Sequence, residues 1–213
     1  GNGGGNRSAG PLGCNTAGNQ GRGGKVLSSS SGTKIFMGGG GGAGHANNGS
    51  ASLNYGGNGG GLIFIWANDL IGNGRLITAN GGTGGASTAD GAGGGGGGGT
   101  IVMNVSNYTG STIIRSNGGN GGLSDNGFTN ARCFGGGGGG SGGAIYFTGA
   151  TPPVTVTANS GAGGLEINPF NCSNPPIPGV AGSNGSIFSN YTFTRSTNPA
   201  NFCGGALPLQ LLF

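Results

Sequence analysis

The stretch GAGGGGGGGTIVMNVSNYTGSTIIRSNGGNGG, residues 91–122, decides the fold expected of this chain. Seven consecutive glycines, Gly93 to Gly99, lead directly into the β-branched run Thr100 to Val105. A polar tip, Ser106 to Gly110, precedes a second strand-like run, Ser111 to Arg115, which ends in glycine again. Strand-forming runs separated by a short polar turn are typical of a β-hairpin. The stretch therefore predicts a glycine arm, a hairpin and a second glycine arm.

The same unit recurs along the chain, which predicts a single repeat-built domain over residues 1–213. Three of the hairpins are followed by the related exits Ala79-Asn80-Gly81, Ser116-Asn117-Gly118 and Ala158-Asn159-Ser160. Corresponding isoleucines, Ile63, Ile101, Ile145 and Ile187, are separated by 38, 44 and 42 residues, and a repeat of this kind indicates stacked units. About five hairpins are expected, near residues 25–37, 62–78, 100–115, 144–157 and 186–194.

The glycine runs require a conformation of their own, because ordering glycine carries a large backbone entropy cost. An extended left-handed helix with three residues per turn satisfies none of its own backbone groups, but such helices can hydrogen-bond to neighbours when packed side by side. We therefore expect an all-β protein with polyglycine II arms and essentially no α-helix. The hairpin stack should lie on one side, and the arms and distal loops on the other.

The amino-acid composition disfavours three classes of protein: disordered linkers, nucleic-acid-binding proteins and membrane-spanning proteins. Glycine contributes 60 of 213 residues, a share also found in disordered linkers, but the apolar residues here are gathered into short runs. Only 6% of residues are charged and the net charge is +4, so no clustered basic surface for nucleic acid is expected. The longest apolar run, residues 62–67, is too short to span a bilayer.

The glycine runs leading into TIVMNV or AIYF and then into ANGGTGG resemble the glycine-rich repeats of large secreted and cell-surface proteins. The arms also resemble the polyglycine II bundles of some phage tail-fibre adhesins. This compositional resemblance covers about residues 21–188. It implies an extracellular architecture and carries over no catalytic or binding residue.

Seven N-x-S/T sequons suit N-glycosylation on exposed loops of a secreted protein. Asn107 and Asn190 fall at or near predicted turns, and Asn104 is the weakest candidate because it can point into the stack. The other candidates at junctions and loops are Asn6, Asn48, Asn171 and Asn184.

Four cysteines lie outside the predicted strands, and none has the spacing of a zinc site. An even number of cysteines in a chain with sequons indicates two disulfides in an oxidising compartment. Cys133 and Cys172 lie in loops of successive repeats and form the preferred pair. Cys14 and Cys203 could join within the chain or between copies, and all three pairings of the four remain open.

No catalytic, cofactor-binding or metal-binding constellation is found, and the chain is not expected to be an enzyme. His45 lies in a polar loop, where an exposed histidine is the simpler interpretation. The acids are dispersed over four segments, which disfavours a carboxylate pair; they are Asp69, Asp90, Asp125 and Glu166. Trp66 could form a platform for carbohydrate, but within LIFIW a packing role is favoured.

The favoured function is a structural glycoprotein subunit of an extracellular filament or surface coat, assembling head to tail with copies of itself. The chain opens inside a glycine arm and closes on an apolar tail at residues 206–213, expected to dock near residues 25–27 of the next copy or to fold back on its own stack. The assembly residues of this tail are Leu207, Leu209, Leu211, Leu212 and Phe213. The alternatives are an adhesin tip that binds a receptor or glycan and, more weakly, an ice-binding protein.

Overall fold

The computed structural model describes residues 21–26, 35–45, 54–88, 90–125, 134–167 and 178–192. Within these ranges the chain forms β-strands and extended segments and no helix. The strands are β1 (Leu62–Ile71), β2 (Arg75–Thr78), β3 (Ser87–Thr88), β4 (Thr100–Thr109), β5 (Thr112–Arg115), β6 (Ser124–Asp125), β7 (Ala144–Phe147), β8 (Thr155–Thr157), β9 (Glu166–Ile167) and β10 (Ser186–Phe188).

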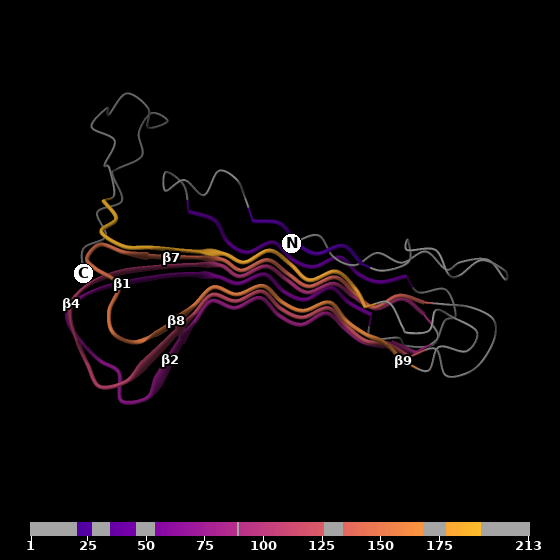
Figure 1. Cartoon of the computed structure of the whole chain (residues 1–213), viewed down its shortest axis with the longest axis horizontal. Helices are drawn as coiled ribbons and strands as arrows, with labels where there is room; N and C mark the ends of the chain where they lie inside the picture. Colours follow the sequence, from indigo (N-terminus) through magenta and orange to yellow (C-terminus); the bar gives the residue numbers. More distant parts are fainter. Residues whose placement is uncertain are drawn as a thin grey trace, which may run out of the picture.

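The strands form three parallel sheets, which the chain visits in turn (Figure 1). Sheet A has the order β1-β4-β7-β10, sheet B the order β2-β5-β8, and sheet C the order β3-β6-β9. Each strand therefore pairs with its equivalent one circuit later. The register places Ile63, Ile101, Ile145 and Ile187 beside one another, as the isoleucine spacing predicts.

The predicted hairpin pairing is wrong within the described residues. β1 and β2 follow each other in sequence but belong to different sheets, and each pairs in parallel with a strand of the next circuit. The predicted tip at residues 106–110 is largely strand, because β4 runs on to Thr109. A strand between two equivalents has both edges hydrogen-bonded, whereas a lone hairpin leaves one edge of each strand unpaired, so stacking satisfies more backbone groups.

The corners between sheets A and B follow the same rule. The corner near Asn73 contains left-handed residues, with φ of 46° at Asn73 and 76° at Gly74. The N–H of Arg75 donates to the carbonyl of Gly72 at 2.8 Å and closes the turn, but β1 and β2 do not pair with each other. Gly72 donates to the carbonyl of Thr109, and Gly74 donates to that of Ser111, so each corner bonds to the corner of the next circuit.

The hydrophobic core lies between sheets A and B. Ile101 and Ile145 of sheet A and Ile114 of sheet B have no exposed surface, and Met103 and Phe147 have 1%. Partly buried side chains from the first strands, such as Ile63 and Ile77, pack against this cluster. This cluster lies at the end of the molecule that contains sheets A and B.

Glycine-rich arms connect this end to sheet C (Figure 1). Inbound arms lead toward sheet A and outbound arms lead away from the A and B end. The inbound arms are residues 21–26, 54–61, 91–99, 135–143 and 178–185, and the outbound arms are residues 35–45, 79–86, 116–123 and 158–165.

Hydrogen bonds between arms recur at every third residue. Gly57 and Gly60 donate to the carbonyls of Gly94 and Gly97, and the N–H groups of Gly94 and Gly97 donate to a third arm, residues 35–45. Between Gly94 and Gly97, the intervening Gly95 and Gly96 donate to Gly138 and Gly82 of two further arms. The arms therefore lie in a bundle in which each segment is held by several neighbours through its backbone.

Two consecutive arms joined by a distal loop always bond to each other among the described residues. The inbound arms 54–61, 91–99, 135–143 and 178–185 each bond in antiparallel fashion to the outbound arm that precedes them, with representative pairs 41/57, 82/96, 119/140 and 161/182. Backbone bonds between neighbouring arms thus flank each of these distal loops.

Other expectations differ at the two ends. The described parts of the first predicted hairpin, residues 25–26 and 35–37, contain no strand, and its centre lies outside the described residues. The return strand predicted at residues 191–194 is not a strand at residues 191–192, and its remainder is outside them. Sheet C was not predicted, because its strands have only two residues each.

Candidate functional site

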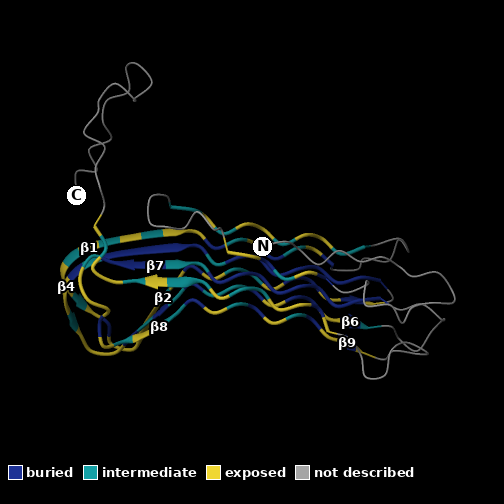
Figure 2. Ribbon diagram, turned by 45° about the horizontal axis from the view of Figure 1, so that its top comes forward, coloured by how far each residue is buried: buried dark blue, intermediate teal, exposed yellow. Residues whose placement is uncertain are grey.

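Among the described strands, β1 forms one edge of sheet A, and its residues are exposed or only partly buried (Figure 2). Leu62, Phe64 and Trp66 alternate along the strand and have 40%, 58% and 77% of their surface exposed. Their register partners Thr100 and Val102 in β4 are only 3% and 4% exposed. Among the described strands, β4 has a neighbour on each side and β1 has one, so the exposed row marks a position at which a further strand would bury apolar surface.

Trp66 was expected to be a packing residue, and this expectation is wrong. Alternation along β1 directs Ile63 and Ile65 toward the core and leaves Trp66 on the opposite face. Sequence reasoning favoured a packing role because Trp66 ends the apolar run LIFIW. Reading the run with a period of two separates its two faces.

The opposite edge of sheet A presents matching groups. β10 continues the isoleucine ladder with Ile187, which is 42% exposed. On the other face, Phe188 stacks on Tyr146 with ring centroids 4.7 Å apart and an interplanar angle of 8°. Burial raises the pKa of Tyr146 above its usual value, and the nearby Tyr191 raises it further. An isoleucine row thus runs across the sheet from β1 to β10. The neighbouring row is aromatic in β1, β7 and β10 and contains Val102 in β4.

An asparagine ladder runs across the outbound arms, parallel to these rows. The side-chain oxygen of Asn80 accepts the N–H of Asn117 at 2.8 Å, and that of Asn117 accepts the N–H of Asn159 at 2.9 Å. The next turn of the arms adds the same bond from the N–H of Ala162 to Asn120. The repeated exit motif thus has a physical cause: each asparagine satisfies a backbone N–H that faces away from the bundle.

The outbound arms also carry a triplet pattern that sequence reasoning missed. Non-glycine residues recur at every third position and point outward, whereas the glycines between them face other arms. The outward positions are Asn80, Thr83 and Ala86, then Asn117, Asn120 and Leu123, then Asn159, Ala162 and Leu165. Eight of these nine positions are exposed, and Asn117 is intermediate. The period of three could have been found in ANGGTGGAS and SNGGNGGLS.

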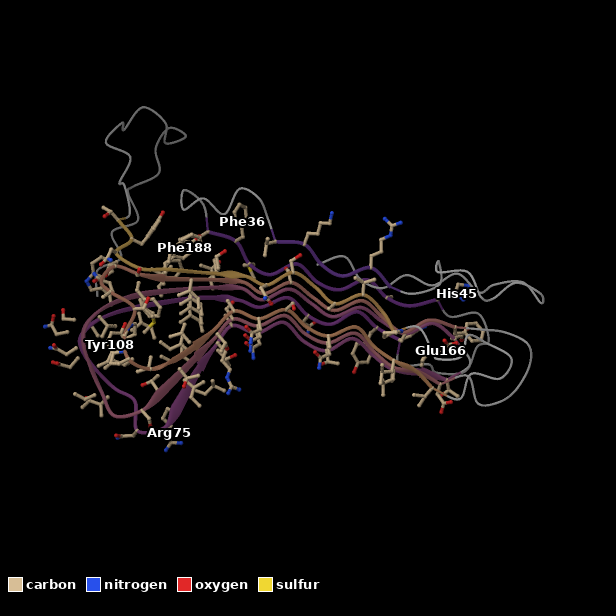
Figure 3. The ribbon with its side chains drawn as sticks, in the orientation of Figure 1. Phe36, His45, Arg75, Tyr108, Glu166 and Phe188 are labelled. Atoms are coloured by element: carbon tan, nitrogen blue, oxygen red, sulfur yellow. The ribbon has the colours of Figure 1, made fainter. Side chains whose placement is uncertain are left out.

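The predicted exposed histidine contacts a buried acid at the far end of the molecule (Figure 3). The Nδ1 atom of His45 lies 3.8 Å from a carboxylate oxygen of Asp90, which has no exposed surface. Neither carboxylate oxygen of Asp90 has a hydrogen-bond partner within the described residues. The fold thus brings together two side chains that are distant in the sequence. Within those ranges no three histidine, cysteine or acidic residues form a metal-binding group.

The remaining acids occupy separate positions. Glu166 is the register partner of Ser124 in sheet C, so Glu166 and Asp125 lie on neighbouring strands. Asp69 lies at the other end, where its carboxylate accepts a hydrogen bond from the amide of Asn107 at 2.9 Å. This arrangement places no pair of carboxylates across a described cleft.

Four of the sequons lie within the described residues. Asn107, Asn184 and Asn190 are exposed. Asn104 is half-buried and its side-chain oxygen accepts a hydrogen bond from Thr148 at 2.7 Å, which makes it the weakest of the four, as the sequence indicates. Asn6, Asn48 and Asn171 lie outside the described residues.

The predicted disulfide and assembly residues lie outside the described residues. They are Cys14, Cys133, Cys172 and Cys203, and Leu207, Leu209, Leu211, Leu212 and Phe213. The proposed docking point for the tail is only partly described. Its residues Lys25 and Val26 belong to the arm 21–26, which bonds to arm 178–185 of the same chain, so this point lies next to the last described arm.

Comparisons with known proteins give no relative on which to base a function. No protein-family model matches the chain, and neither a curated protein nor a solved structure is similar to it. In the part of the chain that the structure describes, no helix has the length and apolarity needed to cross a bilayer.

Proposed function

We propose that this protein is a non-enzymatic structural subunit of an extracellular filament or surface coat, in which copies stack head to tail. The observation that carries the proposal is the apolar row on the open edge of β1. Leu62, Phe64 and Trp66 together expose a strip of large side chains on a strand that has a strand neighbour on only one side among the described residues. Unprotected strand edges pair with further strands, and exposed apolar strips favour burial against a partner.

The two edges of sheet A carry side chains that can continue the same rows across a contact between copies. Placing β1 of one copy beside β10 of another in the existing register would set Ile63 next to Ile187 and Phe64 next to Phe188. This continues both rows and uses different surfaces on the two copies. A contact of that kind does not close on itself and generates an open filament.

The repeat architecture and the conformation of the arms belong to the same proposal. The hydrogen bonds recur at every third residue and join different arms, as expected for polyglycine II helices with three residues per turn and no internal bonds. A subunit built from stacked circuits of this kind can be extended by further circuits without a change in geometry. Backbone bonding in place of a large hydrophobic core suits an elongated structural material.

Electron microscopy of the purified chain tests the proposal. Unmodified protein should form filaments, and the double variant Phe64→Lys/Trp66→Lys should remain folded but monomeric, because lysine on an edge strand blocks pairing. Leu123→Lys is the matched control, since Leu123 is 43% exposed but lies on an outbound arm away from the edge. Filaments formed equally well by the double variant would exclude docking through β1.

Secretion and glycosylation form a separate part of the proposal. Asn107 and Asn190 are exposed, and both stand in N-Y-T sequons. In material from the native source, peptide mapping after glycosidase treatment should find a mass shift at both asparagines. Asn104 serves as the internal comparison and should be less occupied, because its side chain is half-buried and hydrogen-bonded. Unmodified Asn107 and Asn190 would contradict the glycoprotein assignment.

A further inference from the structure

Among the described residues, four arms border a position of the bundle that none of the described arms fills, called here the vacant position. A cavity of about 220 Å³ lies between arms 91–99 and 135–143 on one side and residues 25–26 and 36–39 on the other. Its lining includes the backbone of Gly98, Gly99 and Gly142. The neighbouring positions in this layer of the bundle are filled: arm 35–45 bonds to 54–61 and 91–99, and arm 21–26 bonds to 135–143 and 178–185.

Unpaired backbone groups border this position with the period of the bundle. In arm 135–143, the N–H groups of Gly138 and Ser141 have no hydrogen-bond partner within the described residues, while their carbonyls accept from arm 91–99. In arm 91–99, the carbonyls of Gly95 and Gly98 have no partner there, while their N–H groups donate to arm 135–143. The other residues of the triplets in these two arms bond to the remaining surrounding arms.

The unpaired groups are complementary to a single extended segment. A segment in the vacant position could accept from the N–H groups of Gly138 and Ser141 and donate to the carbonyls of Gly95 and Gly98. Gly95, Gly138 and Ser141 are buried, and buried backbone groups in native proteins are almost always paired. The segment must be rich in glycine, because arms at this spacing approach one another backbone to backbone.

The chain connectivity identifies the segment. Four inbound arms each bond in antiparallel fashion to the outbound arm that precedes them across a distal loop. The fifth inbound arm, residues 21–26, borders the vacant position, and the glycine-rich stretch that precedes it is GNGGG, residues 1–5. In the two longer circuits, the paired residues on either side of the distal loop are 15 positions apart in sequence: 122 and 137, and 164 and 179. Residues 5 and 21 are separated by a similar distance in sequence, 16 positions.

We propose that the vacant position is a binding slot for one glycine arm and that residues 1–5 of the same chain occupy it. This assignment is independent of the filament function. The slot then receives the segment that precedes arm 21–26. Arm 21–26 is the one described inbound arm whose preceding arm lies outside the described residues. The same assignment accounts for both rows of unpaired groups.

Amide hydrogen exchange measured by NMR on the full chain tests the assignment. The N–H groups of Gly138 and Ser141 should be protected to a degree comparable with Gly139 and Gly142, which donate to arm 178–185. In a variant lacking residues 1–5, exchange at Gly138 and Ser141 should accelerate by at least about tenfold, as expected for the loss of one hydrogen bond each. Exchange at Gly139 and Gly142 should not change, which shows that the bundle remains folded.

A second variant keeps the chain length. Gly3→Ser/Gly4→Ser/Gly5→Ser should reproduce the deletion, because side chains at inward positions cannot fit against neighbouring backbone. Rapid exchange at Gly138 and Ser141 in the unmodified chain would overturn the proposal, as would protection that survives the deletion. Protection that grows with protein concentration would assign the slot to a second copy and would overturn occupation by the same chain.

Discussion

At the scale of single residues, the asparagine ladder accounts for the recurrence of Asn80, Asn117 and Asn159. Asn117 takes part in two bonds of the ladder, one through its N–H and one through its side-chain oxygen. Asn117→Ala removes the acceptor for Asn159 and should lower the free energy of unfolding by about 0.5–1.5 kcal/mol, measured by urea denaturation. Asn117→Asp retains an acceptor and should cost less. Thr83→Ala, on the same outward face, is the control, and an equal loss there would show that the ladder bond contributes nothing.

Tyr146 gives the fold a defined sensitivity to alkaline pH. Burial, and secondarily Tyr191, raise the pKa of this phenol above its ordinary value of 10.0. The unfolded chain then loses the proton at a lower pH than the folded chain, so this contribution to stability is complete below pH 10 and is lost as pH rises through 10 and beyond. Tyr146→Phe should therefore show a shallower loss of unfolding free energy between pH 9 and pH 11. A slope identical to that of the unmodified chain would contradict the assigned cause.

At the scale of elements, the arms depend on the absence of side chains at inward positions. Gly96 donates to the carbonyl of Gly82 and accepts from the N–H of Gly119, and a Cβ at this position would meet the carbonyl oxygen of Asn58. Gly96→Ala should destabilise the protein by about 1–3 kcal/mol or more, seen as a lower midpoint in urea. Gly149→Ala is the matched control, because a Cβ there meets nothing within 4 Å, and its effect should stay within about 0.5 kcal/mol. Similar midpoints for both variants would rule out backbone contact as the reason for glycine.

The sequence predicts the positions of the main strands better than their partners. The β-branched run TIVMNV locates β4, the short runs AIYF and SIF locate β7 and β10, and the isoleucine spacing gives their relation across circuits. Pairing is wrong because a short turn such as the one at Asn73 is compatible both with a hairpin and with a corner between two sheets. The choice between a hairpin and a corner depends on the equivalent strands stacked on either side. The local sequence does not show what those neighbouring strands are.

The candidate site was predictable only in part for the same reason. Asn190 is exposed outside the strands, in keeping with its predicted place near a turn. Asn107 is also exposed, although it lies in β4 together with the half-buried Asn104. Exposure of Trp66 does not follow from its apolar neighbours, because it results from β1 being the edge of sheet A. The contact between His45 and Asp90 joins an outbound arm to the start of a later inbound arm, and only the folded bundle brings these together.

At the scale of the whole molecule, parallel pairing in every described sheet gives the stack a direction (Figure 1). β1 forms one edge of sheet A and β10 the other, and the two edges carry different side chains. Contacts between identical edges would set the strands of two copies in opposite directions at the junction. Continuation of the existing register instead requires β10 of one copy to meet β1 of the next.

This geometry fixes the dimensions of the proposed filament. Sheet A contributes four strands per copy, and neighbouring strands lie about 4.8 Å apart, so each copy should advance the filament by about 19 Å. Helical reconstruction from cryo-electron micrographs should find this rise, a strong 4.8 Å spacing along the axis and a polar filament without twofold axes across it. One further strand per copy would increase the rise by about 4.8 Å, so the rise would remain a multiple of the strand spacing. A rise that is not a multiple of the strand spacing, or twofold symmetry perpendicular to the axis, would contradict stacking of β10 on β1, because both follow from continuing one parallel sheet.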